Sequence, residues 1–375
     1  MTDVLIHLGQ HKTGSKALQA YLFHNRDQLI KHKIFYPKSS HQADVAYQKS
    51  HFCLYVISKY EALKALGRDH EANILWLRYG RVCSEKTVYA YFFNIEKERQ
   101  RLAADQVIFS AEDLFDMATA HELAYDPEVC YQAASIICSA CSLVGWKPKL
   151  VVYIRRPDEL VQAQYAQYIK GSDSHVLDFE RYFKAFYPRL NLIALLKPWE
   201  TFFDFASIIV RAYDGKTRRS IVNDFNKVAK FESLKGLKSN PKDLESENRT
   251  PSRVFIDLIR EMNEKRMKGE GFIPRTIILQ YAYDHHSRGV RGWLNQREID
   301  SITSNFFDDF KNVAKSYAIN GFFDKAWQQQ ANLESIDTLT IDEIKFFLEA
   351  FELTPSFYKK IAKKIKFYLV KIKKD

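Results

Sequence analysis

The first residues able to do chemistry form a loop of small and basic side chains, Gly9-Gln10-His11-Lys12-Thr13-Gly14-Ser15-Lys16. The loop follows an apolar run at 4–8, which predicts a β-strand, and it leads into a helix-like segment from Ala17. A turn of this kind directs unpaired backbone N–H groups and the positive end of a helix toward one point, which favours a bound phosphate or sulfate. Lys12 and Lys16 add mobile positive charge. A tight strand-to-helix turn with solvated lysines is the alternative.

The glycines of this loop have the spacing of a known nucleotide-binding motif. Gly9 and Gly14 match the two glycines of G-x-x-x-x-G-K-[ST], but the next two residues are Ser15-Lys16, in the reverse order. This order disfavours an ATP- or GTP-hydrolysing enzyme. A P-loop nucleotide or metabolite kinase stays as an alternative, in which Glu112 or Asp113 would help to hold magnesium.

A second candidate for anion binding is Arg155, which follows the apolar run at 150–154. An Arg at the carboxyl end of a strand is well placed to bind a phosphate in the crevice of an open sheet, because its guanidinium can donate two parallel hydrogen bonds. The alternative is an ion pair at the protein surface. We therefore expect Arg155 and the loop to contribute to one anion-binding region.

Candidate proton acceptors follow another predicted strand. Glu112 and Asp113 come after the run at 107–110, where a carboxylate could take a proton from a reacting hydroxyl. Glu112 is the first choice, and capping of a helix N-terminus by this acidic pair is the alternative. His51 and His11 are further candidate bases.

These stretches resemble the sulfotransferases that use 3′-phosphoadenosine 5′-phosphosulfate (PAPS), especially the bacterial carbohydrate type. The run 6–19, followed by Asn25-Arg26 and Phe35-Tyr36-Pro37, is similar to their 5′-phosphosulfate loop and first helix. The run 150–157, continuing to Gln164-Tyr165, is similar to their 3′-phosphate motif. Weaker similarity extends to about residue 265. The resemblance implies PAPS as the donor, 3′-phosphoadenosine 5′-phosphate (PAP) as the product and no required metal.

The resemblance also implies roles for individual residues. Lys12 would assist departure of the sulfonyl group, and Glu112, in Ser110-Ala111-Glu112, would correspond to a family Ser-x-Glu. Two positions depart from the family pattern: Lys16, where Thr or Ser is usual, and Ala163, where Ser is usual. The predicted catalytic residues are Lys12, Glu112 and His51, with no metal ligand, and the predicted donor-binding residues are His11, Lys12, Thr13, Gly14, Ser15, Lys16, Ala17, Arg155 and Ala163.

The function implied by the resemblance is transfer of a sulfonyl group from PAPS to a hydroxyl of a carbohydrate acceptor by in-line displacement. The acceptor would be a cell-surface or exported glycan, a glycolipid or a lipopolysaccharide. Besides the kinase, one alternative is a catalytically inactive relative that binds a membrane surface, which Ala163 and the lysine-rich end of the chain favour.

The elements that position these residues predict an α/β protein. Short apolar runs separated by helix-like segments are typical of an open parallel sheet flanked by helices. The resemblance implies that this is a P-loop-like sulfotransferase fold, with a helical insertion and a helical C-terminal extension. About a hundred residues separate the first two strands, so we expect a helical insertion at about 50–100 that forms a wall of the substrate site. The predicted core strands are 4–8, 107–110, 150–154 and 207–211. The predicted domains are an α/β domain at 1–265, a helical extension at 266–354 and a basic amphipathic helix at 355–375.

The net charge of +10 is concentrated at one end of the chain. Residues 355–375 hold eight lysines and one aspartate, so this segment has a net charge of +7 out of the net +10 of the chain. The nearly balanced remainder disfavours a nucleic-acid partner. Apolar residues recur at helical spacing among the lysines, which predicts a helix that lies on an anionic membrane surface or packs on the body of the protein.

The cysteines and the start of the chain favour a cytoplasmic protein. Five cysteines are an odd number, typical of reduced thiols. Cys138 and Cys141 have C-x-x-C spacing, but their apolar surroundings favour packing in a buried helix, and the charge-free stretch 129–146 is too short to span a membrane. No secretory signal precedes the first predicted strand. We expect a cytoplasmic location, with peripheral contact to the inner face of the cell membrane as a variant of it.

Overall fold

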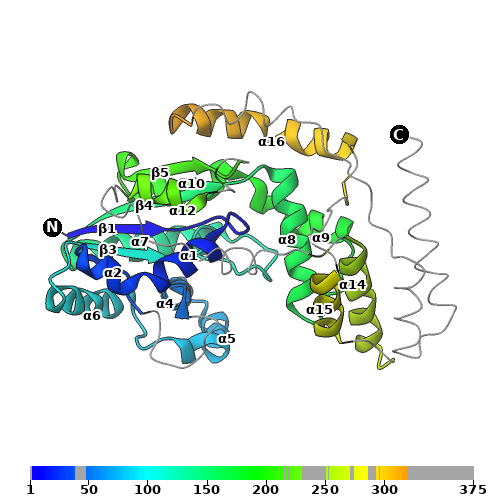
Figure 1. The fold of residues 1–375 in the computed structure, drawn as a ribbon, viewed down its shortest axis with the longest axis horizontal. Helices are drawn as coiled ribbons and strands as arrows, with labels where there is room; N and C mark the ends of the chain where they lie inside the picture. Colours follow the sequence, from blue (N-terminus) through cyan, green and yellow to red (C-terminus); the bar gives the residue numbers. More distant parts are fainter. Residues whose placement is uncertain are drawn as a thin grey trace. The chain divides into compact units, whose positions relative to one another are not determined.

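A computed structural model describes residues 2–38, 48–214, 217, 220–229, 251, 253–270, 274–285, 293–294 and 296–319. In these residues the chain is α/β, with a five-stranded, all-parallel open sheet flanked by helices (Figure 1). This confirms the predicted open parallel sheet, and the two-residue strand β2 is the one addition to the predicted strands. The strands are β1 (Thr2–His7), β2 (Ile34–Phe35), β3 (Gln106–Ser110), β4 (Trp146–Ile154) and β5 (Ile208–Ala212).

The sheet order β2-β3-β1-β4-β5 puts the first strand in the middle. In the register, Leu5 of β1 pairs with Ile108 of β3, and Ile6 pairs with Leu150 of β4. All four side chains are buried, as expected for parallel strands covered on both faces. From β1 the chain forms β2 and β3 on one side of β1. It then crosses to form β4 and β5 on the other side. Open α/β sheets bind ligands at such a switch, outside the carboxyl ends of the strands.

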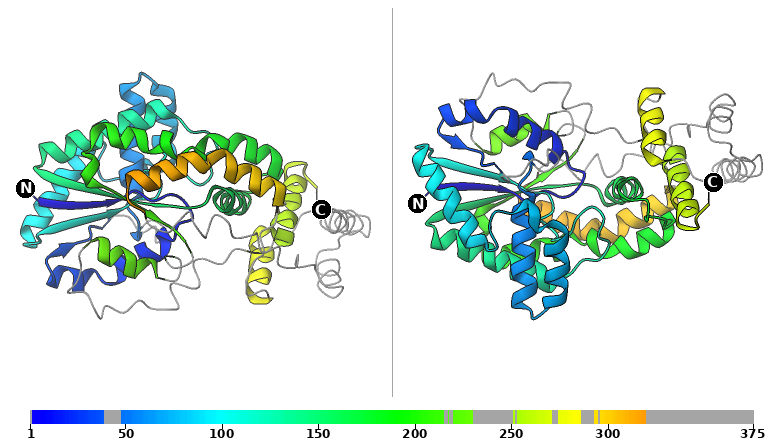
Figure 2. Two further views of the ribbon diagram at one scale, coloured as in Figure 1. Left: turned by 90° about the horizontal axis from the view of Figure 1, so that it is seen from above. Right: turned by 90° about the horizontal axis from the view of Figure 1, so that it is seen from below.

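The chain divides into two compact units, of which the first holds the whole sheet and comprises Met1–Arg156, Phe186–Asn248 and Phe306–Trp327. Figure 2 shows its sheet between two layers of helices, with α1, α2 and α12 on one side and α7 and α10 on the other. The helices of this unit are α1 (Ser15–His24), α2 (Arg26–Lys31), α4 (Phe52–Ala65), α5 (Asp69–Tyr79), α6 (Val88–Arg101), α7 (Pro127–Leu143), α10 (Leu192–Phe202) and α12 (Ile221–Val228), with 3-10 turns at Gly80–Val82, Tyr187–Leu190 and Phe205–Ser207.

Helices α4, α5 and α6 confirm the helical insertion predicted between the first two core strands. Helix α6 begins after Thr87, whose hydroxyl accepts a hydrogen bond from the Ala90 N–H at 3.1 Å. The predicted buried helix after residue 126 is α7, where Cys141 is buried and the Cys138 thiol donates to the Phe202 carbonyl at 3.0 Å. Both are free thiols. Within the described ranges, the helices lack any apolar stretch long enough to cross a membrane.

The second unit comprises Pro157–Ala185, Arg249–Asn305 and Gln328–Asp375. Residues 157–185, which we expected within the α/β domain, thus belong to this unit. Its packing is fixed in part by Asn263, whose amide donates to the carbonyls of Ser172 and His175 at 3.1 and 3.0 Å. The predicted helix at 355–375 lies outside the described residues. The helices are α8 (Pro157–Gly171), α9 (Phe179–Phe186), α14 (Arg253–Met267), α15 (Arg275–His285) and α16 (Gln296–Ser316), whose second half belongs to the first unit.

Candidate functional site

The loop after β1 has the strand-loop-helix form that its sequence predicts. Gly9, Lys12 and Gly14 have φ angles of +65°, +65° and +82°, and α1 begins at the next residue, Ser15. A Cβ on Gly9 would lie 3.1 Å from the Ser15 Oγ and from Glu112, and the positive φ angle adds strain for any residue with a side chain, so glycine is favoured there. The Thr13 hydroxyl donates to the Gln10 carbonyl at 2.5 Å and closes the turn. The first N–H groups of a helix lack partners within the helix, and here they lie at the end of the central strand.

Arg155 is joined directly to this loop. Its backbone N–H donates to the Gln10 Oε1 at 2.8 Å, and its Nη1 donates to the Lys12 carbonyl at 3.0 Å. The guanidinium also lies 5.8 Å from the centre of the Tyr213 ring. Arg155 is only 5% exposed, so the alternative of a surface ion pair is wrong. The two stretches predicted to bind anions therefore meet at the carboxyl ends of neighbouring strands.

Gln10 is a site residue that the sequence reasoning missed. It is buried, and its side chain links the loop to the Arg155 backbone. The available signal was a polar residue directly after Gly9, in the loop that follows a buried strand. Its partner, 145 residues away in the chain, could not be inferred from spacing.

Glu112 lies at the end of β3, on the other side of β1 from Arg155. The closeness of its Cα and Cβ to Gly9 puts its backbone against the loop. Residues 112–117 form consecutive turns, and the next helix begins at Pro127 with Asp126 as its cap. Glu112 and Asp113 therefore do not cap a helix. Glu112 is a partly exposed carboxylate just after the carboxyl end of β3.

His11 and Asp113 form a second contact between the loop and the end of β3. The His11 Nε2 lies 2.8 Å from the Ala118 carbonyl and 3.7 Å from the Asp113 Oδ1. Because a carbonyl only accepts, Nε2 carries the proton. Burial raises the pKa of Asp113 well above its usual value, and the nearby carboxylates of Glu112, Asp116 and Glu122 raise it further. Asp113 thus keeps its proton to higher pH than an ordinary aspartate, which favours Glu112 as the base.

Comparison with known proteins leaves this geometry to be interpreted from its chemistry. No family model matches the chain, and no curated protein matches it. The candidate site consists of three features at adjacent strand ends: a strand-to-helix turn, a buried arginine joined to it and a carboxylate. Among the residues that the structure describes, no group of three or more His, Cys, Asp or Glu side chains is placed to hold a metal ion.

His51 does not join this site as a base. It is fully buried at the start of α4, where its Nδ1 accepts a hydrogen bond from the Ser110 N–H at 3.0 Å. Its Nε2 lies 3.2 Å from the Pro37 carbonyl and donates to it. Burial is the largest cause that lowers the pKa of His51 to about 3. Both ring nitrogens bind the backbone, so we correct the prediction: His51 positions the end of β3 and is not placed to move a substrate proton.

The remaining predicted donor-binding residues have different settings. Thr13, Ser15 and Ala17 are buried at the start of α1, whereas Lys16 is exposed. The Ser15 Oγ is buried without a hydrogen-bond partner in the described part of the chain, which is unusual for a hydroxyl. Ala163 is buried in α8, which belongs to the second unit.

Proposed function

We propose that this chain is a sulfotransferase that moves the sulfonyl group of PAPS to a hydroxyl of a carbohydrate acceptor, on a P-loop-like sulfotransferase fold. The observation that carries the proposal is the direct bonding of Arg155 to the loop, through Gln10 and Lys12. PAPS has a phosphosulfate at the 5′ end of its ribose and a phosphate at the 3′ position. A protein that holds it needs two anion sites in one place, and these two sites lie 143 residues apart in sequence.

The residues present fit such a donor. The turn between Gly9 and Ser15 presents backbone N–H groups and the start of α1, which suit a phosphosulfate. The unpaired Ser15 Oγ supplies a hydroxyl donor there. Arg155 donates its Nη1 to the Lys12 carbonyl, and a guanidinium is the side chain best suited to bind a phosphate through two parallel hydrogen bonds.

The proposed reaction is an in-line displacement at sulfur. Glu112 accepts the proton of the acceptor hydroxyl while that oxygen forms its bond to sulfur. The bond from sulfur to the 5′-phosphate oxygen breaks, and its electron pair stays on that oxygen. Lys12 stabilises the negative charge that develops there, so catalysis consists of positioning, charge stabilisation and one proton transfer.

The acceptor and location belong to the same proposal. A glycan, glycolipid or lipopolysaccharide is the proposed acceptor, in a cytoplasmic protein without a nucleic-acid partner. Contact of residues 355–375 with an anionic membrane surface remains a prediction about a segment outside the described residues.

The test uses the full chain in two assays. Isothermal titration calorimetry with PAP in EDTA is expected to show binding, with no tighter binding of ATP in the presence of magnesium. Incubation with PAPS carrying a labelled sulfonyl group is expected to label polysaccharide or lipopolysaccharide fractions. Phosphate transfer from ATP would establish the kinase alternative, and label entering only small phenols would refute the carbohydrate acceptor. PAP binding or membrane binding without any turnover would indicate an inactive relative.

A further inference from the structure

The segment 111–126 carries Glu112 and Asp113 yet contains neither a helix nor a strand. We call it the carboxylate segment. Met117 within it has a φ angle of +48°, a left-handed conformation that is costly for a residue with a side chain. Such a conformation persists only when the surroundings fix it. The buried apolar residues of the carboxylate segment are Ala111, Leu114, Phe115, Met117 and Ala118.

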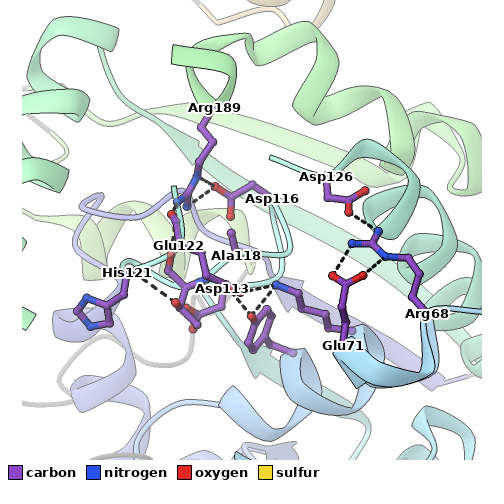
Figure 3. Close-up of polar contacts among 12 residues, drawn as sticks. Arg68, Glu71, Asp113, Asp116, Ala118, His121, Glu122, Asp126 and Arg189 are labelled. Atoms are coloured by element: carbon purple, nitrogen blue, oxygen red, sulfur yellow. Dashed lines mark hydrogen bonds and ion pairs between the residues drawn. The ribbon is translucent and has the colours of Figure 1, made fainter. Parts of the chain in front are cut away.

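The side chain that fixes most of this segment is Arg189, from the turn Tyr187–Leu190. It is 2% exposed. Its Nε donates to the Asp116 Oδ2 at 2.8 Å, and its Nη2 lies 2.6 Å from the same oxygen. Its Nη1 donates to the carbonyls of Thr119, at 3.3 Å, and Glu122. One buried guanidinium therefore holds the segment at three positions (Figure 3).

The carboxylate segment is also held at Glu122 by helix α4 of the helical insertion. The Glu122 carboxylate accepts hydrogen bonds from the Tyr55 hydroxyl at 2.9 Å and from the Lys59 ammonium at 2.7 Å, both on α4. It also accepts the Thr119 N–H at 2.6 Å. Ala118, between the positions that Arg189 holds, accepts from His11 of the phosphate-binding loop. This hydrogen bond is a direct contact between the segment and the loop.

We propose that Arg189 is a positioning residue that sets the path of the carboxylate segment and so places Glu112 beside the loop. The catalytic part of this inference rests on the proposed function. Burying an ion pair carries a desolvation cost, and apolar pairs of similar size often give equal or greater stability. A guanidinium also supplies directed bonds to two carbonyls, which an apolar side chain cannot. The Arg189–Asp116 ion pair is therefore better explained by its effect on the position of the segment than by a contribution to the stability of the fold.

A second arginine provides a matched control on the same segment. Arg68 binds Glu71, with its Nε 2.6 Å from Oε1, and also pairs with Asp126 at the segment's far end (Figure 3). Its side chain is 31% exposed, against 1% for Arg189, so solvent screens its pairs. We expect Arg68→Met to change kcat by less than twofold.

The test compares four variants by kcat at saturating donor and acceptor, PAP affinity and melting temperature. Arg189→Met is expected to lower kcat at least tenfold while the Kd for PAP stays within threefold. The double variant Arg189→Met/Asp116→Leu, which removes both charges, is expected to recover the melting temperature but not kcat. Arg189→Lys keeps the positive charge but loses the several directed N–H donors of the guanidinium. Its kcat is therefore expected to fall about fivefold, with little change in melting temperature. Arg68→Met serves as the control.

Hydrogen exchange separates this inference from the proposed function. In Arg189→Lys, residues 112–122 are expected to exchange faster while the peptide that covers β1 and α1 exchanges as in the wild type. A wild-type protein with no sulfonyl transfer would refute the proposed function and the catalytic role of the placement, but faster exchange would still establish the clamp. Full kcat in Arg189→Lys or in the double variant, or unchanged exchange at 112–122, would overturn the inference.

Discussion

The loop at residues 9–16 and the carboxylate segment lie at the ends of neighbouring strands but are built in opposite ways. The loop takes its shape from its own sequence: two glycines, the Thr13 hydroxyl and the start of α1 fix it within eight residues. The carboxylate segment takes its shape from side chains far away in the chain, with Arg189 and Lys59 as its main holders. A site can thus combine one half that is encoded locally with one half that depends on the completed fold.

Glu112→Gln gives the largest expected effect, because it removes the proposed base and leaves the segment in place. We expect kcat to fall at least a hundredfold, since general-base catalysis typically contributes about 10²–10⁴-fold. Asp113→Asn is the control: Asp113 already retains its proton to raised pH, so its kcat should stay within about threefold. A larger loss for Asp113→Asn than for Glu112→Gln would exchange the two assignments.

Lys12→Ala tests the loop half of the site. Losing a charge-stabilising contact to the leaving oxygen is expected to reduce turnover about a hundredfold, or about 3 kcal/mol. Lys12 has a left-handed backbone, so Lys12→Gly removes the ammonium without backbone strain and should show the same loss. Lys31→Ala, at an exposed position of α2, is the control and should change turnover less than threefold. Unchanged turnover in Lys12→Gly would refute the role of the side chain.

The same contrast explains how much could be predicted from the sequence. The central strands, the loop and the helical insertion were predictable because apolar runs and glycine spacing are local signals. The two-residue strand β2 was not, since so short a run has no periodicity. The partners of Gln10 and Asp116 come from positions 145 and 73 residues away, so no local pattern indicates them. His51 suited a base by residue type alone, and only its burial and two backbone partners exclude that role.

Acid should lower the stability of the fold through His51, which holds the end of β3. Burial lowers the pKa of His51 in the folded protein to about 3, below its unfolded value of 6.5. The unfolded chain therefore takes up a proton first, and stability is lost as pH falls from about 6.5 toward 3. At pH 5 this residue should account for about 2 kcal/mol of lost unfolding free energy relative to pH 7.

Urea unfolding at pH 7 and pH 5 measures this loss. The variant His51→Gln keeps a hydrogen-bond donor and an acceptor but cannot titrate. Its decrease in unfolding free energy between the two pH values should be smaller than that of the wild type by about 2 kcal/mol. His7 is also buried, with its pKa lowered to about 4, so the wild-type decrease should exceed the part due to His51. Equal decreases in variant and wild type would contradict the assignment.

Gln10→Ala has the smallest expected effect and tests whether the two stretches predicted to bind anions act together. The change leaves the buried Arg155 N–H without its acceptor, and an unsatisfied buried donor costs about 1–3 kcal/mol. Part of that cost should appear as weaker PAP binding, by about tenfold in Kd, because Arg155 is no longer fixed against the loop. Calorimetric titration with PAP measures it, and Gln28→Ala, at an exposed position on α2, serves as the control. Wild-type affinity in a folded Gln10→Ala protein would show that Arg155 and the loop bind independently, and that the Lys12 carbonyl alone positions the guanidinium.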